Sequence, residues 1–136
     1  MIKVLIADDH PFVRGAIGDL LAATDDIRVV AECSDGCDVV EAAARTAPDV
    51  VLMDLAMPVM DGLAATRALR AAQPDVRVIV LTGSVNTAAV RQAHALGVCG
   101  FLVKAHAGDE LPRHIRAVAE GGTAWNPIAA ELATPA

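Results

Sequence analysis

The chain has 136 residues, of which 54% are hydrophobic and 2% are aromatic, and its formal net charge is −6. This length and hydrophobic content fit one folded domain and exclude a disordered chain. The negative charge argues against direct nucleic acid binding by this chain, because contacts with phosphates need a basic face.

The cysteines Cys33, Cys37 and Cys99 fit neither a disulfide framework nor the paired spacing of a structural zinc site. We interpret them as small buried hydrophobic residues. No apolar run approaches the roughly 20 residues of a transmembrane helix, and the N-terminus lacks the layout of a signal peptide. We therefore expect a protein of the reducing cytoplasm that does not associate with membranes.

Short apolar runs alternate along the chain with segments of helical periodicity. The predicted strands cover residues 2–7, 27–33, 50–53, 76–81 and 98–103. The helices that follow them are predicted to begin at Pro11, near Val39, near Leu63, at Thr87 and behind a capping side chain at Asp109. The segment 34–36 is predicted to supply capping side chains for the second helix, and Gly97 to end the fourth.

The alternation of strands and helices predicts an α/β fold with right-handed crossovers. Its simplest form is a doubly wound, five-stranded parallel sheet of the flavodoxin-like order 2-1-3-4-5, with helices on both faces. Residues 1–122 form the predicted domain. Residues 123–136 differ in composition from the rest of the chain, because they contain the only Trp, two prolines and many alanines. We expect them to form a C-terminal tail, as a short helix or linker on the domain, or the start of a linker to an output domain outside these residues.

Polar residues stand at the ends of four predicted strands. Asp8 and Asp9 follow the first strand, Asp54 the third, Thr82 the fourth and Lys104 the fifth. Ligands bind at the carboxyl ends of the strands in an open α/β sheet, and these strands are neighbours in the predicted order. Each residue alone is a weak signal, since such residues are common in turns and on surfaces. Their joint placement predicts a functional site.

Three carboxylates in one crevice need a counter-charge. Two like charges ~5 Å apart repel by roughly 3 kcal/mol at an effective dielectric constant near 20. A bound Mg²⁺ removes this repulsion, because it takes about six oxygen ligands. Asp9 and Asp54 are the expected direct ligands, Asp8 binds directly or through water, and the backbone carbonyl of Ala56 completes the site.

A carboxylate beside a metal ion can attack a phosphoryl group and become an aspartyl phosphate. Phosphoryl transfer depends mainly on positioning and on neutralising the charge of the phosphoryl oxygens. Mg²⁺ would hold one oxygen, the ammonium group of Lys104 a second, and the hydroxyl of Thr82 a third. We therefore predict that Asp54 is the nucleophile.

This pattern closely resembles the receiver domain of two-component response regulators over residues 2–122. The matching positions are Asp8, Asp9, the segment 53–62, Thr82 and Lys104. The segments 5–11, 100–104 and 115–122 resemble the NarL/FixJ-type subfamily in particular.

The resemblance implies that a histidine kinase transfers its phosphoryl group to Asp54, and that the product hydrolyses slowly by self-catalysis. It implies a switch that controls an output, in most such regulators transcription through a LuxR-type DNA-binding domain. These 136 residues contain no such domain. The chain is thus expected to be a phosphoacceptor and not a multiple-turnover enzyme.

Three positions bear on the switch. The family often has proline at a cis bond after the lysine, whereas Ala105 follows Lys104 here. Gly83 follows Thr82 and should loosen the switch loop. Phe101 matches the switch aromatic of the family, but it lacks a hydroxyl group, so packing alone would drive a change of its rotamer. The default alternative is that Phe101 is an ordinary core residue.

Several alternatives stay open at this point. A stand-alone regulator without an output domain is one, and a homodimer through the first and fifth helices or through the fourth-helix face is another. A haloacid-dehalogenase-like hydrolase is a rival, but Asp54 is followed two residues later by Ala56 instead of a second Asp. A scaffold that is never phosphorylated is disfavoured by the complete set of site residues. His10 could contact phosphate, although a surface position is favoured, and Trp125 is expected to anchor the tail.

Overall fold

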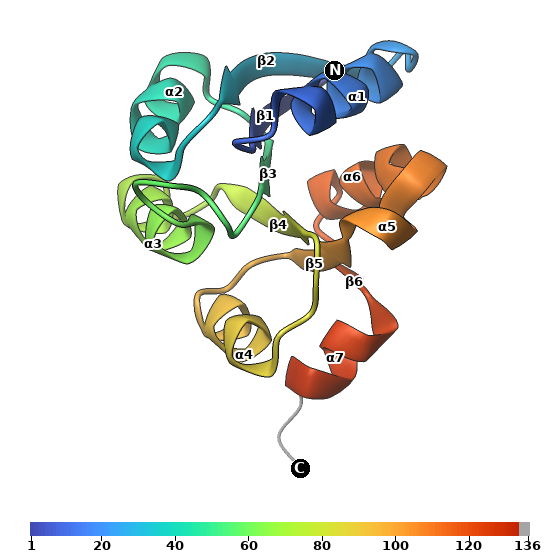
Figure 1. The fold of residues 1–136 in the computed structure, drawn as a ribbon. Helices are drawn as coiled ribbons and strands as arrows, with labels where there is room; N and C mark the ends of the chain where they lie inside the picture. Colours follow the sequence, from blue (N-terminus) through green and yellow to red (C-terminus); the bar gives the residue numbers. More distant parts are fainter. Residues whose placement is uncertain (134–136) are drawn as a thin grey trace.

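The computed structural model describes residues 1–133, with the side chain of His106 excepted. One parallel sheet with the strand order β2-β1-β3-β4-β5-β6 forms the centre of the molecule (Figure 1). The strands are β1 Ile2–Ala7, β2 Ile27–Cys33, β3 Val50–Met53, β4 Arg77–Thr82, β5 Gly100–Val103 and β6 Ala124–Trp125. The predicted order of the first five strands is confirmed.

Helices cover both faces of the sheet, as predicted. They are α1 Pro11–Ala22, α2 Val39–Thr46, α3 Gly62–Ala72, α4 Thr87–Ala95, α5 Lys104–Ala107, α6 Leu111–Ala119 and α7 Pro127–Ala133. Helices α2, α3 and α4 lie on one face, and α1, α5 and α6 lie on the other (Figure 1). Short 3₁₀ turns at Gly36–Asp38 and Gly108–Glu110 precede α2 and α6.

The core consists of two apolar layers separated by the sheet, because successive strand residues point to opposite faces. Val51 and Met53 face the layer under α2, α3 and α4, whereas Val50 and Leu52 face the layer under α1 and α6. All four residues of β3 are buried, which explains why this strand is a continuous apolar run in the sequence.

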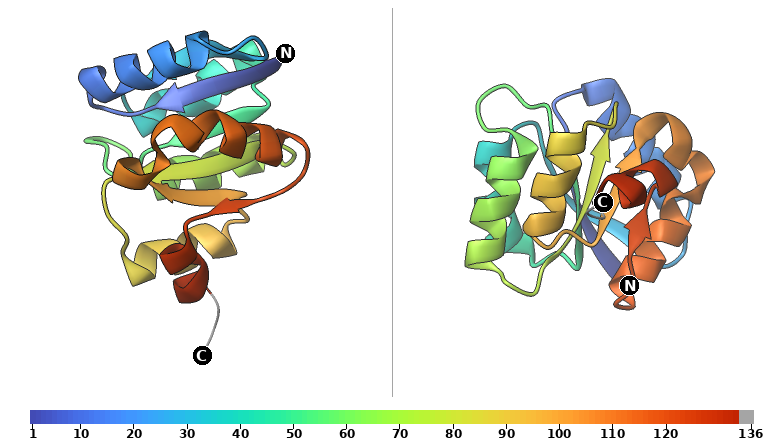
Figure 2. Two further views of the ribbon diagram at one scale, coloured as in Figure 1. Left: turned by 90° about the vertical axis from the view of Figure 1, so that its right-hand side faces the viewer. Right: turned by 90° about the horizontal axis from the view of Figure 1, so that it is seen from below.

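The C-terminal tail departs from the prediction, because it adds a sixth strand to the sheet. Ala124 and Trp125 pair with Gly100 and Phe101 of β5 in parallel register. Helix α7 follows and lies beside α4, as both views of Figure 2 show. A two-residue strand has no alternating pattern of its own, so the sequence contains no signal that could have predicted it.

Several local predictions can now be judged. The side chain of Asp35 accepts a hydrogen bond from the amide of Cys37 and caps the turn before α2, as expected. Gly97 follows α4 with φ +78°, which confirms its predicted place at the helix end. The expected cap at Asp109 is wrong: Asp109 lies within a 3₁₀ turn, and α6 begins at Leu111 with no side-chain cap.

The edge of the sheet at the amino ends of the strands is held by an ion pair. Arg116 of α6 donates from Nε and from one terminal nitrogen to the two carboxylate oxygens of Asp26, at 2.7 and 2.9 Å. Asp26 directly precedes β2, and its carbonyl accepts a hydrogen bond from the amide of Ile2 in β1. This bidentate contact joins α6 to the start of two strands.

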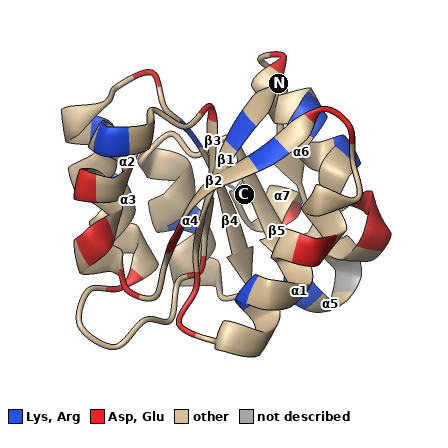
Figure 3. Cartoon of the chain, turned by 90° about the horizontal axis from the view of Figure 1, so that it is seen from above, with Lys and Arg blue, Asp and Glu red and all other residues tan. Residues whose placement is uncertain are grey.

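The described residues form no helix that is both long and apolar enough to span a bilayer. In Figure 3, Lys and Arg positions are scattered over several helices and strands among Asp and Glu positions. The expectation that this chain does not bind nucleic acid by itself stays a prediction.

Candidate functional site

The carboxyl ends of β1, β3, β4 and β5 bring the predicted site residues to one edge of the sheet. Asp8 and Asp54 are buried residues that directly follow the last residues of β1 and β3, and Thr82 is the buried last residue of β4. Lys104 follows β5 and is the first residue of α5. Because the strands are parallel and adjacent, residues up to 96 positions apart in the chain meet at this edge.

The ammonium group of Lys104 bridges two of the carboxylates. Its Nζ lies 2.7 Å from Oδ2 of Asp8 and 3.2 Å from Oδ2 of Asp54. The Lys104 side chain is only 20% exposed, and both carboxylates are 3% exposed. Water screens such a contact weakly, so the lysine is a strong local counter-charge for this acidic site.

His10 also belongs to the site, although the sequence favoured a surface position for it. Its Nδ1 lies 3.0 Å from Oδ1 of Asp8, 3.0 Å from Oδ1 of Asp9 and 3.8 Å from Oδ2 of Asp54. The imidazole remains 59% exposed, so it lines the mouth of the site. Its position directly after the two aspartates is the sequence signal for a place near the site, and its exposure agrees with the favoured surface position.

The acidic residues form a group whose chemistry suits a divalent cation. One ligand atom from each of Asp8, Asp9, His10 and Asp54 lies within 4.8 Å of the others. Oδ1 of Asp9 is buried and accepts no hydrogen bond from the described residues, although Nδ1 of His10 lies 3.0 Å from it in a geometry that makes no hydrogen bond. A buried carboxylate oxygen that accepts no hydrogen bond suits a cation, and hard oxygen ligands are those that Mg²⁺ prefers. The residues present therefore fit the predicted metal ion.

The loop between β3 and α3 is held close to Asp54 by backbone contacts. The amide of Gly62 donates to the carbonyl of Leu55 at 3.0 Å, and the amide of Ala56 lies 3.4 Å from Oδ1 of Asp54. A Cβ atom at Gly62 would overlap the carbonyl oxygen of Asp54. Glycine is therefore required at position 62. The contact of Ala56 with the carboxylate is made by its amide, and the role of its carbonyl as a metal ligand stays a prediction.

Asp35 braces the same loop from the other side. Its carboxylate accepts hydrogen bonds from the amides of Val59 and Met60 at 2.9 and 3.0 Å, in addition to that of Cys37. These backbone donors lower the pKa of Asp35 to about 2, because they stabilise its charged form. The sequence indicated only a local capping role for Asp35, since the loop amides lie more than 20 positions away.

Phe101 lies behind the site in the interior. Its side chain is fully buried on the α4 face of the sheet. It stacks against Trp125 with ring centroids 6.1 Å apart and an interplanar angle of 15°. The core position of Phe101 and the anchoring role of Trp125 are thus both seen, and movement of Phe101 as a switch stays a prediction.

Comparison with known proteins agrees with this geometry. Residues 4–116 match the response regulator receiver domain. The chain belongs to this family.

The most similar sequences include receiver domains within longer regulators. The transcriptional regulatory protein LiaR of Bacillus subtilis is 39% identical over 121 residues, which are 89% of this chain and 57% of LiaR. The response regulator GacA of Pseudomonas aeruginosa is 39% identical over 134 residues, which are 98% of this chain and 63% of GacA. The chain therefore spans about 60% of the length of the relatives that it matches.

Solved structures give the same assignment. A LuxR-family two-component response regulator from Aurantimonas sp. SI85-9A1 superposes with a TM-score of 0.90 at 30% sequence identity, covering 96% of this chain and 94% of that one. The chain is thus a receiver domain of the LuxR/NarL type, homologous to transcriptional regulators.

The pKa values of the two buried carboxyl groups of this receiver domain shift in opposite directions. Burial raises the pKa of Asp54, opposed by the charge of Lys104 and reinforced by that of Asp8. Burial also acts to raise the pKa of Asp8, but hydrogen bonds from Lys104 and His10 outweigh it, so this pKa is lowered. Desolvation of the Lys104 ammonium is likewise outweighed by both carboxylates, and the pKa of Lys104 is raised. The pocket therefore holds a firmly charged Lys104–Asp8 pair beside Asp54.

The bond after the lysine is regular in this receiver domain. No cis peptide bond occurs among residues 1–133, so Lys104 and Ala105 are joined by a trans bond. The chain then enters α5 directly and leaves it at Gly108, whose φ is +43°.

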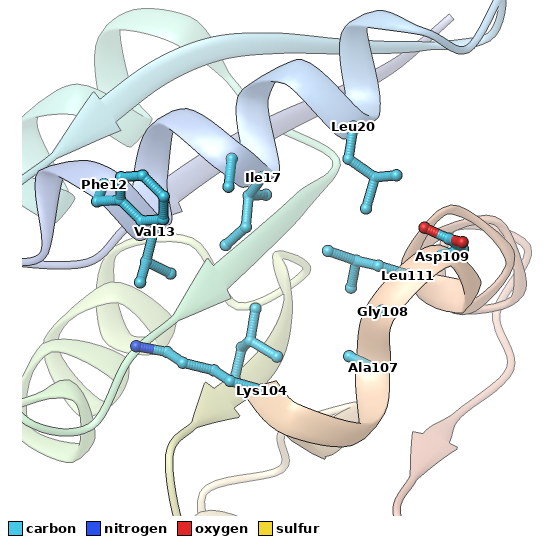
Figure 4. A pocket seen from close by; sticks show the side chains of 11 residues that line it. Phe12, Val13, Ile17, Leu20, Lys104, Ala107, Gly108, Asp109 and Leu111 are labelled. Atoms are coloured by element: carbon cyan, nitrogen blue, oxygen red, sulfur yellow. The ribbon is translucent and has the colours of Figure 1, made fainter.

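An apolar groove borders the receiver site (Figure 4). It lies between α1 and the segment that contains α5 and the start of α6, with a volume of about 390 Å³. Val13 and Leu111 line opposite sides of it, and Lys104 extends from its rim. Phe12 also lines the groove, in the first turn of α1, and it is 89% exposed. The groove thus places an exposed aromatic ring next to the acidic site.

Proposed function

We propose that Asp54 accepts a phosphoryl group from a histidine kinase in a Mg²⁺-dependent reaction. The observation that carries this proposal is the buried carboxylate of Asp54 at the end of β3, with the Lys104 ammonium 3.2 Å away and Asp8 and Asp9 beside it. A carboxylate oxygen of Asp54 forms a bond to phosphorus while the bond between phosphorus and the kinase histidine nitrogen breaks. The leaving imidazole keeps the electron pair of that bond.

Asp9 and Asp54 would bind Mg²⁺ directly, Asp8 directly or through water, and the backbone carbonyl of Ala56 would complete the protein ligands. Bound Mg²⁺ neutralises negative charge on the phosphoryl oxygens. Lys104 is already within reach of Asp54 and would pair with a second phosphoryl oxygen. The hydroxyl of Thr82 would donate to a third. Burial keeps water from screening these contacts.

The phosphoryl group adds a charge of about −1.5 to −2 and new acceptor oxygens at Asp54. Thr82 moves toward these oxygens and vacates space behind β4. Phe101 turns into this space by packing alone, since its ring carries no hydroxyl group. The surface of α4 and β5 then changes, as a shift between two packed arrangements.

The output of this receiver domain is proposed to be transcription through a DNA-binding domain outside the 136 residues, as the similarity to LuxR-type regulators suggests. Residues 1–122 would form the receiver unit, and residues 123–136 the tail or the start of the connection. A stand-alone single-domain regulator is the alternative. Formation of a homodimer is a separate possibility that is compatible with either output. The domain acts as a phosphoacceptor with slow self-dephosphorylation and not as a multiple-turnover enzyme.

Phosphorylation with acetyl phosphate and Mg²⁺, followed by intact mass spectrometry, tests the assignment. The unmodified chain gains one phosphoryl group, and Asp54→Asn gains none. Asp61→Asn is the matched control, because Asp61 caps α3 in the same loop and asparagine caps equally well. Stoichiometric phosphorylation of Asp54→Asn would overturn the assignment, and multiple turnover of small phosphate esters would favour a hydrolase.

A further inference from the structure

Residues 124–133, here called the C-terminal segment, cover the outer edge of β5 and one side of α4. The amide of Ala124 donates to the carbonyl of Cys99 at 2.9 Å, and the amide of Asn126 donates to that of Phe101 at 2.8 Å. Helix α7 then runs beside α4 (Figures 1 and 2). The segment thus occupies the surface that the proposed switch is expected to alter.

Trp125 is the centre of this contact. Its ring stacks on that of Phe101, and the imidazole of His94 in α4 meets it edge-on, with centroids 5.8 Å apart and planes at 62°. Phe101 is completely shielded from solvent beneath it. The position of Trp125 therefore depends on that of Phe101, because offset and edge-on ring contacts have narrow geometric preferences.

The domain surface is shaped to receive the segment. A Cβ atom at Gly100 would lie 2.5 Å from the carbonyl oxygen of Ala124, so β6 can approach β5 only because residue 100 is glycine. Ala129 of α7 is fully buried, and Nε of Arg91 in α4 donates to the carbonyl of Leu132 at 3.3 Å. The surface of the domain therefore accommodates the segment through Gly100 and Arg91, and the segment buries Ala129 against it.

The C-terminal segment nevertheless consists of two short elements. β6 contains two residues and α7 seven. An isolated helix of this length is unstable in water, so its structure depends on the contacts with α4 and β5. Segments with few buried contacts open more readily than the core of a domain. A change at Phe101 would therefore act on a segment whose structure depends on its contacts with the rest of the domain.

We propose that the C-terminal segment is a phosphorylation-sensitive clasp on the surface of α4 and β5. In the arrangement described here, Phe101 holds Trp125 and the clasp is closed. When phosphorylation of Asp54 draws Phe101 toward Thr82, Trp125 loses its stacking partner and the segment is released. This inference rests on the proposed function, and it adds the element that receives the signal.

The chain carries its own probe for this contact. Trp125 is the only Trp, and the sequence contains no Tyr, so intrinsic fluorescence reports on the clasp alone. On phosphorylation with acetyl phosphate and Mg²⁺ we expect Trp125 emission to shift to longer wavelength, as the ring becomes solvated. Amide hydrogen exchange over residues 124–133 should rise by roughly two- to tenfold, the range for the loss of one aromatic contact. Both changes should be absent in Asp54→Asn.

Two alanines of α7 test the clasp without phosphorylation. Ala129→Glu places a charge where the methyl group is fully buried, and should release the segment. Ala130→Glu, at the exposed neighbouring position, should leave emission and exchange unchanged. Equal exchange over 124–133 in the two variants would overturn the clasp.

Intact mass measured on the same samples separates the two proposals. If mass shows one phosphoryl group per chain while emission and exchange stay constant, the clasp is wrong and the phosphoacceptor assignment stands. If the chain gains no phosphoryl group, both proposals are overturned. A phosphorylated chain with red-shifted emission and faster exchange supports both.

Discussion

The ammonium group of Lys104 lies 2.7 Å from Asp8 and 3.2 Å from Asp54, so it contacts two of the proposed metal ligands and lies closer to Asp8 than to the proposed phosphoacceptor. We therefore expect Lys104 and a divalent cation to compete for the same carboxylates. Entry of a cation should free the lysine from Asp8, so that it can turn toward a phosphoryl oxygen on Asp54.

Removing this competitor should strengthen metal binding. We expect Lys104→Met to raise the affinity for Mg²⁺ by roughly tenfold, because a unit positive charge leaves a poorly screened pocket. Isothermal titration with MgCl₂ measures the change. Arg113→Met is the control, since Arg113 is exposed and pairs with Glu110 in α6 and the preceding turn. Unchanged or weaker binding by Lys104→Met would contradict the competition.

Gly62 is expected to be essential for the geometry around Asp54. Gly62→Ala should destabilise the domain by about 1–3 kcal/mol, because its methyl group would overlap the carbonyl of Asp54 and force the loop to move. Urea unfolding measures this loss. Gly15→Ala in α1 meets nothing within 4 Å and should instead stabilise the domain by about 0.5–1 kcal/mol. Equal stabilities of the two variants would argue against the contact.

Asp35 should give the domain a pH-dependent stability. Its pKa is lowered to about 2 in the folded state from an ordinary value of 3.8. Its contribution is therefore complete above the ordinary value and is lost as the pH falls through about 2. Unfolding free energies measured between about pH 5 and pH 2 should fall less steeply for Asp35→Asn than for the unmodified chain. Asp38→Asn, which alters an exposed carboxylate that makes no capping hydrogen bond, should keep the original slope.

Phe12 beside the groove is expected to serve the phosphodonor protein and not the chemistry. With a histidine kinase that phosphorylates the unmodified chain, Phe12→Ser should lower the rate of transfer by roughly tenfold, since an exposed aromatic ring is a common anchor in protein interfaces. Labelling by acetyl phosphate should be unchanged, because this donor needs no protein contact. A loss of both reactions would instead place Phe12 in support of the site itself.

The acidic site could be predicted from the sequence because its residues stand at the ends of strands. Parallel strands deliver their carboxyl ends to one edge, so Asp8, Asp54 and Lys104 had to meet once the strand order was correct. The same reasoning gave the buried layers on the two faces of the sheet, since β3 is a continuous apolar run.

Other features depend on contacts that local patterns do not encode. β6 forms only because Gly100 leaves room for the backbone of Ala124. Asp35, in the turn after β2, reaches across to the loop after β3, and no spacing rule predicts that contact. Asp109 failed as a helix cap because Gly108 turns the chain with φ +43° and a 3₁₀ turn intervenes. In each case the competing influence was tertiary.

The ion pair between Arg116 and Asp26 has a consequence for how this domain tolerates change. It ties α6 to the sheet at the end opposite the acidic site through two hydrogen bonds between half-exposed side chains. At the acidic site, by contrast, the lysine contacts two buried carboxylates at once, and we expect these contacts to change when a cation or a phosphoryl group is bound. A contact between two structural elements and a group of reactive side chains thus lie at opposite ends of one sheet. Substitutions at the Arg116 end should alter the free energy of unfolding, and substitutions at the Lys104 end should alter phosphorylation of Asp54.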